Sequence, residues 1–168
     1  MCRAFESRQG YHNKNVELAN LRLAPFFFVQ PSSPHPHPDF VTSLRILDYR
    51  RLGKQRIEAL QLLRAISVKG SGWSHHPAAA MWRGYVNALK QYHNIAIDEC
   101  VRRGYCNSMP KKQIRGQVVY PTWLGDKAFH ASHRSNLLRK DRDYYGAFGW
   151  TEPDDLPYVW PGQMVEEA

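Results

Sequence analysis

Apolar residues at helical spacing constrain this chain more than any other feature. Across residues 42–67 they recur every three or four positions, as one buried face of an α-helix requires. The stripe consists of Ile46, Tyr49, Gly53, Ile57 and Leu60, flanked by Leu52, Ala59 and Leu63. Gly53 at its centre weakens the helix but lets another backbone pack closely. We therefore predict one amphipathic helix with this stripe buried and the opposite arc exposed. The charged residues of that arc are Asp48, Arg50, Arg51, Lys54 and Glu58.

One cation falls inside the apolar sector of this predicted helix. Arg56 lies between the directions of Tyr49 and Leu63. A buried guanidinium needs a partner, and the acidic pair at positions 154–155 is one candidate.

Two further helices follow along the chain. Pro77 suits a first helical position and opens a helix expected to run to about Arg103, with Gly104 as its stop. A third helix is expected over residues 127–145, with Asp126 as its N-cap. No segment shows the strict alternation typical of strands. We predict an all-α fold, a compact single-domain helical bundle with an extended N-terminal segment and an extended C-terminal tail.

The ends of the chain differ in composition from its middle. Residues 30–38 hold four prolines, which favour an extended, non-helical segment. We expect residues 1–38 to be an extension that is poorly ordered or processed. Residues 39–161 form the predicted helical domain, and residues 162–168 an acidic tail.

The charge of the chain is unevenly distributed. Its formal net charge is +8, but the last 17 residues hold five acids and no Lys or Arg. The first 151 residues therefore carry +13. Such a surface attracts polyanions. We therefore favour a nucleic-acid-binding protein over a basic protein whose charge serves only solubility.

Several classes of protein are disfavoured by what the sequence lacks. Three cysteines without a CxxC pair argue against a disulfide scaffold and indicate an intracellular, reducing compartment. That compartment is the cytoplasm or nucleus, or an organelle if residues 1–38 are a leader. No apolar run approaches a membrane span. No Gly-rich nucleotide loop or GxSxG motif is present, and we expect neither cofactor nor metal.

The third predicted helix brings polar groups to two of its faces. Its polar arc includes Ser132, His133, Asn136, Arg139 and Lys140. His130 and Arg134, spaced i, i+4, point inward between Leu137 and Leu138. Two inward polar groups are either a satisfied structural pair or the floor of a site. The histidines at 75, 76, 130 and 133 leave a metal-assisted site open as an alternative, although no HExxH motif or cysteine completes a recognisable ligand set.

Several strings give the chain a family resemblance. They are "PDF" (38–40), "LDYRRLGKQRIEALQ" (47–61), "HHPAAAMWRGY" (75–85), "WLGDKAFHASHRSNLLRKDRDYY" (123–145) and "DDLPYVWP" (154–161). In these residues the chain resembles the pyrimidine-dimer DNA glycosylase (endonuclease V-like) family, and its bacterial-type branch most closely. The resemblance covers residues 38–161.

The resemblance implies an all-helical domain that clamps duplex DNA and displaces a nucleotide from the stack. In the family the nucleophile is the amine of the enzyme's own N-terminus. This amine attacks C1′ of the damaged nucleoside to give an imine, and β-elimination then nicks the strand. A glutamate on the first helix assists. The family has an arginine before that glutamate, and Arg50 occupies its position in this chain. A later arginine of the family corresponds to Lys54, and the glutamate itself corresponds to Arg51. A guanidinium cannot act as a base near neutral pH, so the family's carboxylate is missing from this position.

Nearby side chains can take the place of the family's glutamate and N-terminal amine. Glu58 lies four residues after Lys54, and like-charged neighbours can depress the pKa of the Lys54 amine. The alternative is an ordinary exposed helix pair. Our candidate catalytic residues are Lys54, Glu58 and His130, the last as a proton-transfer group. Our candidate nucleic-acid-binding residues are Arg50, Arg51, His76, His133, Arg134 and Lys140.

The sequence therefore predicts a DNA-repair-type glycosylase, with or without AP-lyase activity, that acts on damaged or modified bases by base flipping and an imine intermediate. Its partner would be double-stranded DNA carrying a damaged or modified base, and we expect a monomer with no membrane association. Two alternatives stay open: a non-catalytic DNA- or RNA-binding module on the same fold, and a His-rich metal-assisted nuclease.

Overall fold

A computed structural model describes residues 34–68 and 72–161. These residues contain six α-helices, one 3-10 helix and no β-strand, which confirms the all-α fold. The elements are α1 (Phe40–Arg45), α2 (Tyr49–Ser67), α3 (Pro77–Ala80), α4 (Val86–Arg102), α5 (Lys127–Lys140), α6 (Arg142–Tyr145) and η1 (Gly146–Phe148). The described residues do not include positions 1–33 of the predicted N-terminal extension or the predicted acidic tail at 162–168. The domain boundaries stay predictions.

The first predicted helix is two helices with a sharp junction. Residues 42–67 were expected to be continuous, but α1 ends at Arg45 and α2 begins at Tyr49. Asp48 takes an extended conformation, and its Oδ1 accepts the backbone N–H groups of Arg50 and Arg51 at 2.9 and 3.1 Å. This N-cap satisfies donors that a helix start leaves free, and it breaks the helix at Asp48.

The buried face of α2 is rotated from the predicted stripe. Tyr49 and Ile57 were expected inside but are 43% and 47% exposed. The buried residues are Leu52, Gly53, Gln55, Glu58, Ala59, Leu62, Leu63 and Ala65. Burial of Gly53 is thus confirmed, but the expectation that the arc of Glu58 is exposed was wrong.

Hydrogen bonds explain how two polar side chains can occupy the buried face of α2. The Gln55 amide donates to Glu58 at 2.9 Å, and the buried hydroxyl of Tyr92 donates to Gln55 at 2.9 Å. Buried polar groups are tolerated when they are bonded in this way. Helical spacing alone does not reveal such a network.

Arg56 is partly buried, and among the described residues it is hydrogen-bonded to an amide side chain. Its Nη1 donates to Asn107 Oδ1 at 2.9 Å. Asp154 instead lies 2.8 Å from Arg142. The predicted pairing of Arg56 with residues 154–155 was therefore wrong.

The second predicted helix is also divided. It starts at Pro77 as expected, but α3 ends at Ala80, and α4 starts only after Gly84, which has φ +85°. Gly104 does stop α4, as predicted. At φ +81° it directs its N–H to Val101 O, while Tyr105 N–H reaches Cys100 O. This is the Schellman pattern in which a left-handed glycine closes a helix.

The third predicted helix begins as expected and then bends. Asp126 is its N-cap, accepting from Phe129 N–H at 2.7 Å. The helix was expected to reach Tyr145, but α5 ends at Lys140. Asp141 leaves the helical conformation and caps the short α6 by accepting from Tyr144 N–H. The chain therefore changes direction at Lys140–Asp141.

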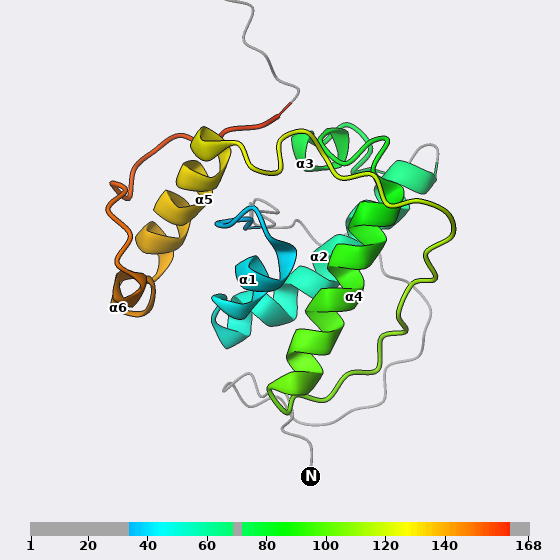
Figure 1. Cartoon of the computed structure of the whole chain (residues 1–168), viewed down its shortest axis with the longest axis horizontal. Coiled ribbons are helices and arrows are strands. Elements are labelled where there is room, and N and C mark those ends of the chain that lie inside the picture. Colours follow the sequence, from blue (N-terminus) through cyan, green and yellow to red (C-terminus); the bar gives the residue numbers. More distant parts are fainter. Residues whose placement is uncertain (1–33, 69–71, 162–168) are drawn as a thin grey trace, which may run out of the picture.

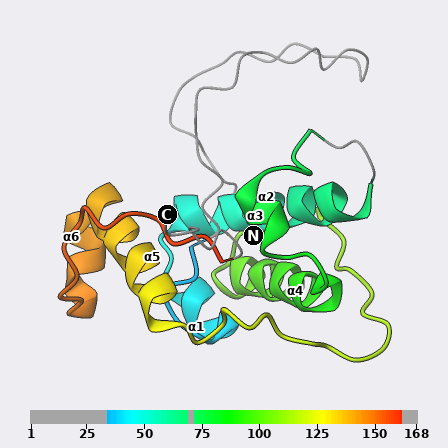
Figure 2. The ribbon, with the colours of Figure 1, turned by 90° about the horizontal axis from the view of Figure 1, so that it is seen from above.

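The helices surround a core that is rich in aromatic rings. Figure 1 shows α2 crossing α4, α1 near the centre, and α5 and α6 on the other side. The view from above in Figure 2 places α1 between α5 and α4. His35 is fully buried there, with ring centroids 4.6 Å from Tyr92, 5.3 Å from Trp123 and 5.6 Å from Trp82. Such tilted and edge-on pairs add to the packing energy of the core.

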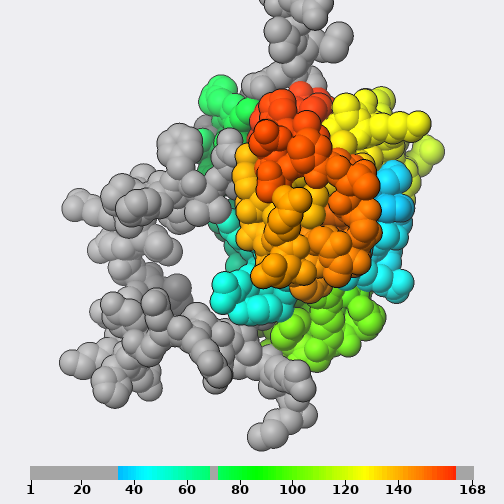
Figure 3. All heavy atoms as spheres, turned by 90° about the vertical axis from the view of Figure 1, so that its left-hand side faces the viewer, coloured from blue at the N-terminus to red at the C-terminus, as the bar shows by residue number. Residues whose placement is uncertain are grey.

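The helix α5, the helix α6 and the C-terminal segment 150–161 cover one side of the molecule (Figure 3). Hydroxyl groups of α5 hold the segment in place. Ser135 accepts the N–H of Leu156 at 3.0 Å, and Ser132 accepts that of Val159 at 3.3 Å. These two hydrogen bonds fix the segment to α5 although it has no regular secondary structure.

The loop between α4 and α5 is fixed in a similar way. Asn94 on α4 donates to Lys112 O at 2.8 Å and accepts from Lys112 N–H at 2.7 Å. Asn87, two turns earlier, donates to the carbonyls of Arg115 and Gln117. Two side chains of α4 thus satisfy backbone groups along this loop.

A search of the described residues found no helix that is both long and apolar enough to cross a membrane.

The buried histidines make stability depend on pH. Burial lowers the pKa of His35 to about 3, and burial also lowers the pKa of His133 well below its usual range. The unfolded chain binds protons at these rings below about pH 6.5, and the folded chain does not. The free energy of unfolding should be at its full value above pH 6.5 and be lost as pH falls. Each histidine contributes about 1.4 kcal/mol per pH unit.

Urea unfolding at pH 7.5, 6.5 and 5.5 tests this prediction. We expect His133→Phe to give a shallower fall than the parent chain, because one of the two rings no longer titrates. The raised pKa of Glu58, caused by burial, acts in the opposite direction in acid. An unchanged slope in the variant would contradict the assignment.

Candidate active site

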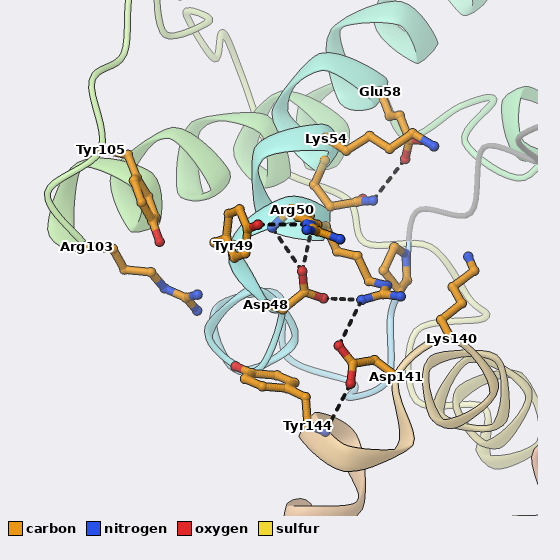
Figure 4. A pocket seen from close by; sticks show the side chains of 13 residues that line it. Asp48, Tyr49, Arg50, Lys54, Glu58, Arg103, Tyr105, Lys140, Asp141 and Tyr144 are labelled. Atoms are coloured by element: carbon orange, nitrogen blue, oxygen red, sulfur yellow. Dashed lines mark hydrogen bonds and ion pairs between the residues drawn. The ribbon is translucent and has the colours of Figure 1, made fainter. Parts of the chain in front are cut away.

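A pocket of about 790 Å³ lies between the first half of α2 and the junction of α5 with α6 (Figure 4). Residues Asp48 to Glu58 form one wall, and Lys140, Asp141 and Tyr144 form the facing wall. Arg103 and Tyr105 close it from the end of α4, and Pro34 also lines it. The lining includes four of the predicted cations, namely Arg50, Arg51, Lys54 and Lys140.

Asp48 organises the base of the pocket. Its Oδ1 caps α2, and its Oδ2 accepts the Tyr145 hydroxyl at 2.6 Å and the Arg51 guanidinium. Burial alone would raise the pKa of this carboxyl, but the hydrogen bonds from Tyr145 and Arg51 hold the pKa below its usual value. Asp48 is therefore a fixed anion that joins α2 to α6.

Arg51 occupies the position where the resemblance places a glutamate, and its charge is largely compensated. Its Nη1 contacts Asp48 and lies 3.9 Å from Asp141, and its guanidinium lies 5.4 Å from the Tyr145 ring centroid. Arg51 thus bridges the two walls. Arg50 is exposed, and its Nε donates to the Tyr49 hydroxyl at 2.7 Å.

Glu58 supplies a carboxylate to the same pocket. Its side chain is only 5% exposed, and it contacts Gln55 and Lys54, whose Nζ lies 3.3 Å from Oε1. Burial raises the pKa of Glu58 despite the opposing effect of the Lys54 and Lys140 charges. Residues 51 and 58 are two helical turns apart, about 10 Å along the axis and on one face. The carboxylate therefore sits farther along the helix than the family pattern places it.

Lys140 enters the pocket from the other wall. As the last residue of α5 it lines the cavity and faces α2 across it (Figure 4). Desolvation, together with the charges of Arg51 and Lys54, lowers the pKa of Lys140 to about 8, and Glu58 opposes this shift. Its amine is thus partly neutral near physiological pH.

The other predicted site residues do not line this pocket. His130 is buried, its Nε2 accepting from Gly125 N–H at 2.9 Å and its Nδ1 contacting His35 O. Burial lowers its pKa. His133 is buried in the aromatic core, in edge contact with Phe129 and Tyr158. Both residues occupy structural positions, so they stay outside the site proposed below.

Arg134 and His76 lie at other places. Arg134 Nε donates to Glu152 at 2.7 Å and its Nη1 to Pro36 O, so its charge fixes the C-terminal segment. His76 caps α3 through Nδ1, which accepts from Ala78 N–H at 3.0 Å. Their predicted DNA contacts stay predictions. No cluster of three or more potential metal ligands occurs among the described residues.

Several pocket residues were missed at the level of sequence. Asp48 and Asp141 were not recognised as helix breaks, although an aspartate beside a charged helical run is a typical N-cap signal. The place of Tyr144 on the pocket wall depends on the unexpected bend at Asp141. Arg103 lines the pocket because it donates to the Leu47 carbonyl at 2.7 Å and to the Arg45 carbonyl at 2.6 Å.

The chain is thus an all-helical protein with a cationic pocket that contains a buried carboxylate. A family model described as pyrimidine dimer DNA glycosylase matches residues 33–113, just under half of the chain. This match supports the family that the sequence motifs indicated. It supports a DNA-repair glycosylase in general, with DNA as its substrate. Searches of curated proteins and of solved structures gave no match.

The matched segment includes only part of the pocket. The α2 wall and Arg103 fall within residues 33–113, but Lys140, Asp141 and Tyr144 do not. The second wall therefore lies outside the segment that the family model matches.

Asp48 should be important for stability. Asp48→Ala removes the cap of α2 and leaves the buried Tyr145 hydroxyl and Arg51 without their acceptor, so we expect a loss of about 2–4 kcal/mol in the free energy of unfolding. Asp48→Asn should cost less, because asparagine also caps helices well. Urea unfolding of both variants at pH 7.5 measures the difference. A loss below about 1 kcal/mol for Asp48→Ala would contradict this role.

Proposed function

We propose that this pocket is the active site of a DNA glycosylase that also cleaves the strand at abasic sites, through an imine between a pocket amine and the sugar. The observation that carries the proposal is the meeting of lysine amines, a buried carboxylate and arginines in one cavity. The family match supports glycosylase activity in general. The amine chemistry, the lyase step and a damaged or modified base in duplex DNA as the target are our proposals.

The first step is attack of an unprotonated amine on C1′ of the target nucleoside. The new N–C1′ bond forms as the glycosidic bond breaks, and the base leaves with the bonding electrons and takes up a proton. The amine nitrogen then loses a proton. Its lone pair opens the C1′–O4′ bond while O4′ takes up a proton, which gives an iminium and a C4′ hydroxyl. An amine is a suitable nucleophile only in its neutral form.

The second step is β-elimination. A base removes a proton from C2′, a C2′–C3′ double bond forms, and the C3′–O bond breaks with its electrons leaving on the phosphate. Water then hydrolyses the imine and releases the amine. Glu58 is the proposed base, because its carboxylate lies in the pocket and its raised pKa makes it a better proton acceptor than an ordinary glutamate.

The remaining cations suit the phosphates that flank the extruded nucleotide. Arg50 and Lys54 are both exposed, and both line the pocket from α2. Such contacts position the strand but carry no sequence information. Lesion choice would follow from how easily a damaged step unstacks and releases its base.

Borohydride trapping on a duplex with one abasic site tests the proposal. Borohydride delivers hydride to C1′ of the iminium and converts it to a stable secondary amine, so a covalent protein–DNA adduct is expected. DNA binding without an adduct or strand cleavage would instead favour a binding module on this fold. Cleavage lost with a chelator and restored by a divalent cation would favour a metal-assisted nuclease.

Replacement of Glu58 tests the role of the carboxylate. Glu58→Gln keeps the size of the side chain but removes the base, so strand cleavage at an abasic site should fall by at least about 100-fold. DNA binding, measured by fluorescence anisotropy, should be retained. Asp155→Asn is the matched control, because Asp155 is exposed and does not line the pocket. Equal cleavage by Glu58→Gln and the control would exclude Glu58 as the base.

A further inference from the structure

We propose that Lys140 is the amine that forms the imine, with Lys54 and Arg51 as the cations that keep it reactive. This inference rests on the proposed function and names the nucleophile of that site. It assigns the chemistry to the α5 wall of the pocket, which the family match does not cover.

The position of Lys140 follows from the bend after α5. Asp141 leaves the helix and caps α6, so α5 ends at Lys140 and the chain turns away. The side chain of Lys140 is left on the pocket wall opposite α2 (Figure 4). It remains exposed to solvent, as a group that must meet a sugar carbon requires.

Lys54, the other lysine that lines the pocket, is held in an ion pair. Lys54 lies on the same helix as Glu58, one turn before it, and its Nζ is 3.3 Å from the carboxylate. This ion pair holds the Lys54 amine against the carboxylate, whereas Lys140 reaches the cavity from the facing wall. The arginines of the pocket retain their protons under all relevant conditions. The amine of the chain's N-terminus lies outside the described residues.

The charges around Lys140 favour its neutral form. Arg51 and Lys54 face it from α2, Arg139 precedes it on α5, Asp141 follows it, and Glu58 is the carboxylate that opposes them. Desolvation and these cations lower its pKa to about 8. At pH 8 roughly half of such amines are neutral, against roughly 0.4% for a lysine of ordinary pKa. The gain in neutral amine is on the order of 100-fold.

The same arrangement pairs the nucleophile with its base. Glu58 and Lys140 are close enough for each to affect the pKa of the other. An abasic sugar in its open-chain form presents an aldehyde at C1′. Addition of the Lys140 amine forms the N–C1′ bond and releases the carbonyl oxygen as water. Glu58 can then take the C2′ proton from the resulting iminium.

The experiment is borohydride trapping of the full chain on an abasic duplex, followed by digestion with a protease that cuts before aspartate. This digestion separates the candidates, because Lys54 falls in residues 48–97 and Lys140 in residues 126–140. Fragmentation of the modified peptide distinguishes Lys140 from Lys127, which share the second peptide. The adduct is expected on Lys140.

Three arginine variants give the matched comparison. Lys140→Arg keeps the charge but removes the nucleophile, and trapping should fall by at least about 100-fold. Lys127→Arg changes an exposed lysine at the opposite end of α5 and should trap like the parent chain. Lys54→Arg keeps the charge that acts on Lys140 and should still form the adduct there.

The pH dependence of the trapping rate is a second test, because a purely structural role of Lys140 would not set the midpoint of this profile. The trapping rate of the parent chain should rise with a midpoint near pH 8, the pKa of Lys140. Lys54→Met removes a repelling charge, so the midpoint should move to higher pH, whereas Lys54→Arg should leave it in place.

The outcomes separate this inference from the function on which it rests. An adduct in residues 48–97 or in the N-terminal peptide, or unchanged trapping by Lys140→Arg, overturns Lys140 as the amine and leaves the imine enzyme intact. Absence of an adduct and of strand cleavage on the abasic duplex, together with absence of base release from a duplex that carries a damaged base, overturns the two together. Base release from that second duplex without an adduct overturns the amine mechanism but retains glycosylase activity.

Discussion

The buried carboxylate of Asp48 is the interaction on which the geometry of this molecule depends. It ends one helix, caps the next and accepts the hydroxyl of Tyr145 from the far side of the fold. Because the cap fixes where α2 starts and the bond to Tyr145 fixes how α2 faces α6, the two together determine the rotation of α2. That rotation turns Tyr49 outward and Glu58 inward. The pocket, its carboxylate and its cations are consequences of this one anchor.

The charges of the pocket have two distinct uses. Arg51 is compensated by Asp48 and approached by Asp141, and it serves to hold the walls together. Glu58 and Lys140 form a second group, in which desolvation, their own charges and the charge of Lys54 shift the pKa of both. The cavity keeps a carboxylate although an arginine stands at the family's glutamate position, because Glu58, two turns farther along the same face, lines it. The bridge between the walls and the proposed chemistry are thus assigned to different residues of the pocket.

Much of the fold could be predicted from local signals, and the rest depended on contacts between distant residues. The helical segments, the N-cap at Asp126, the stop at Gly104 and the burial of Gly53 all follow from spacing and conformational preference. The breaks at Asp48 and Asp141 follow from hydrogen bonds that outweigh continuous helical propensity. The buried face of α2 was mispredicted because Gln55 and Glu58 are bonded to each other and to Tyr92, a residue of another helix. Of the site, Arg50, Lys54 and Lys140 line the pocket, but the partner of Arg134 is a glutamate 18 residues away that periodicity cannot reveal.

The asparagines of α4 have a consequence for how this chain can vary. Asn94 and Asn87 bind main-chain atoms of the loop that follows α4, and they make no demand on the loop's own side chains. Part of the path of the loop is therefore encoded in a helix, beside the contribution of the loop's own Asn107, which bonds both main-chain groups of Met109. An exposed position such as Arg115 can exchange its charge for a neutral residue during evolution while the backbone keeps its course. Replacement of either asparagine, by contrast, would release a whole stretch of chain at once.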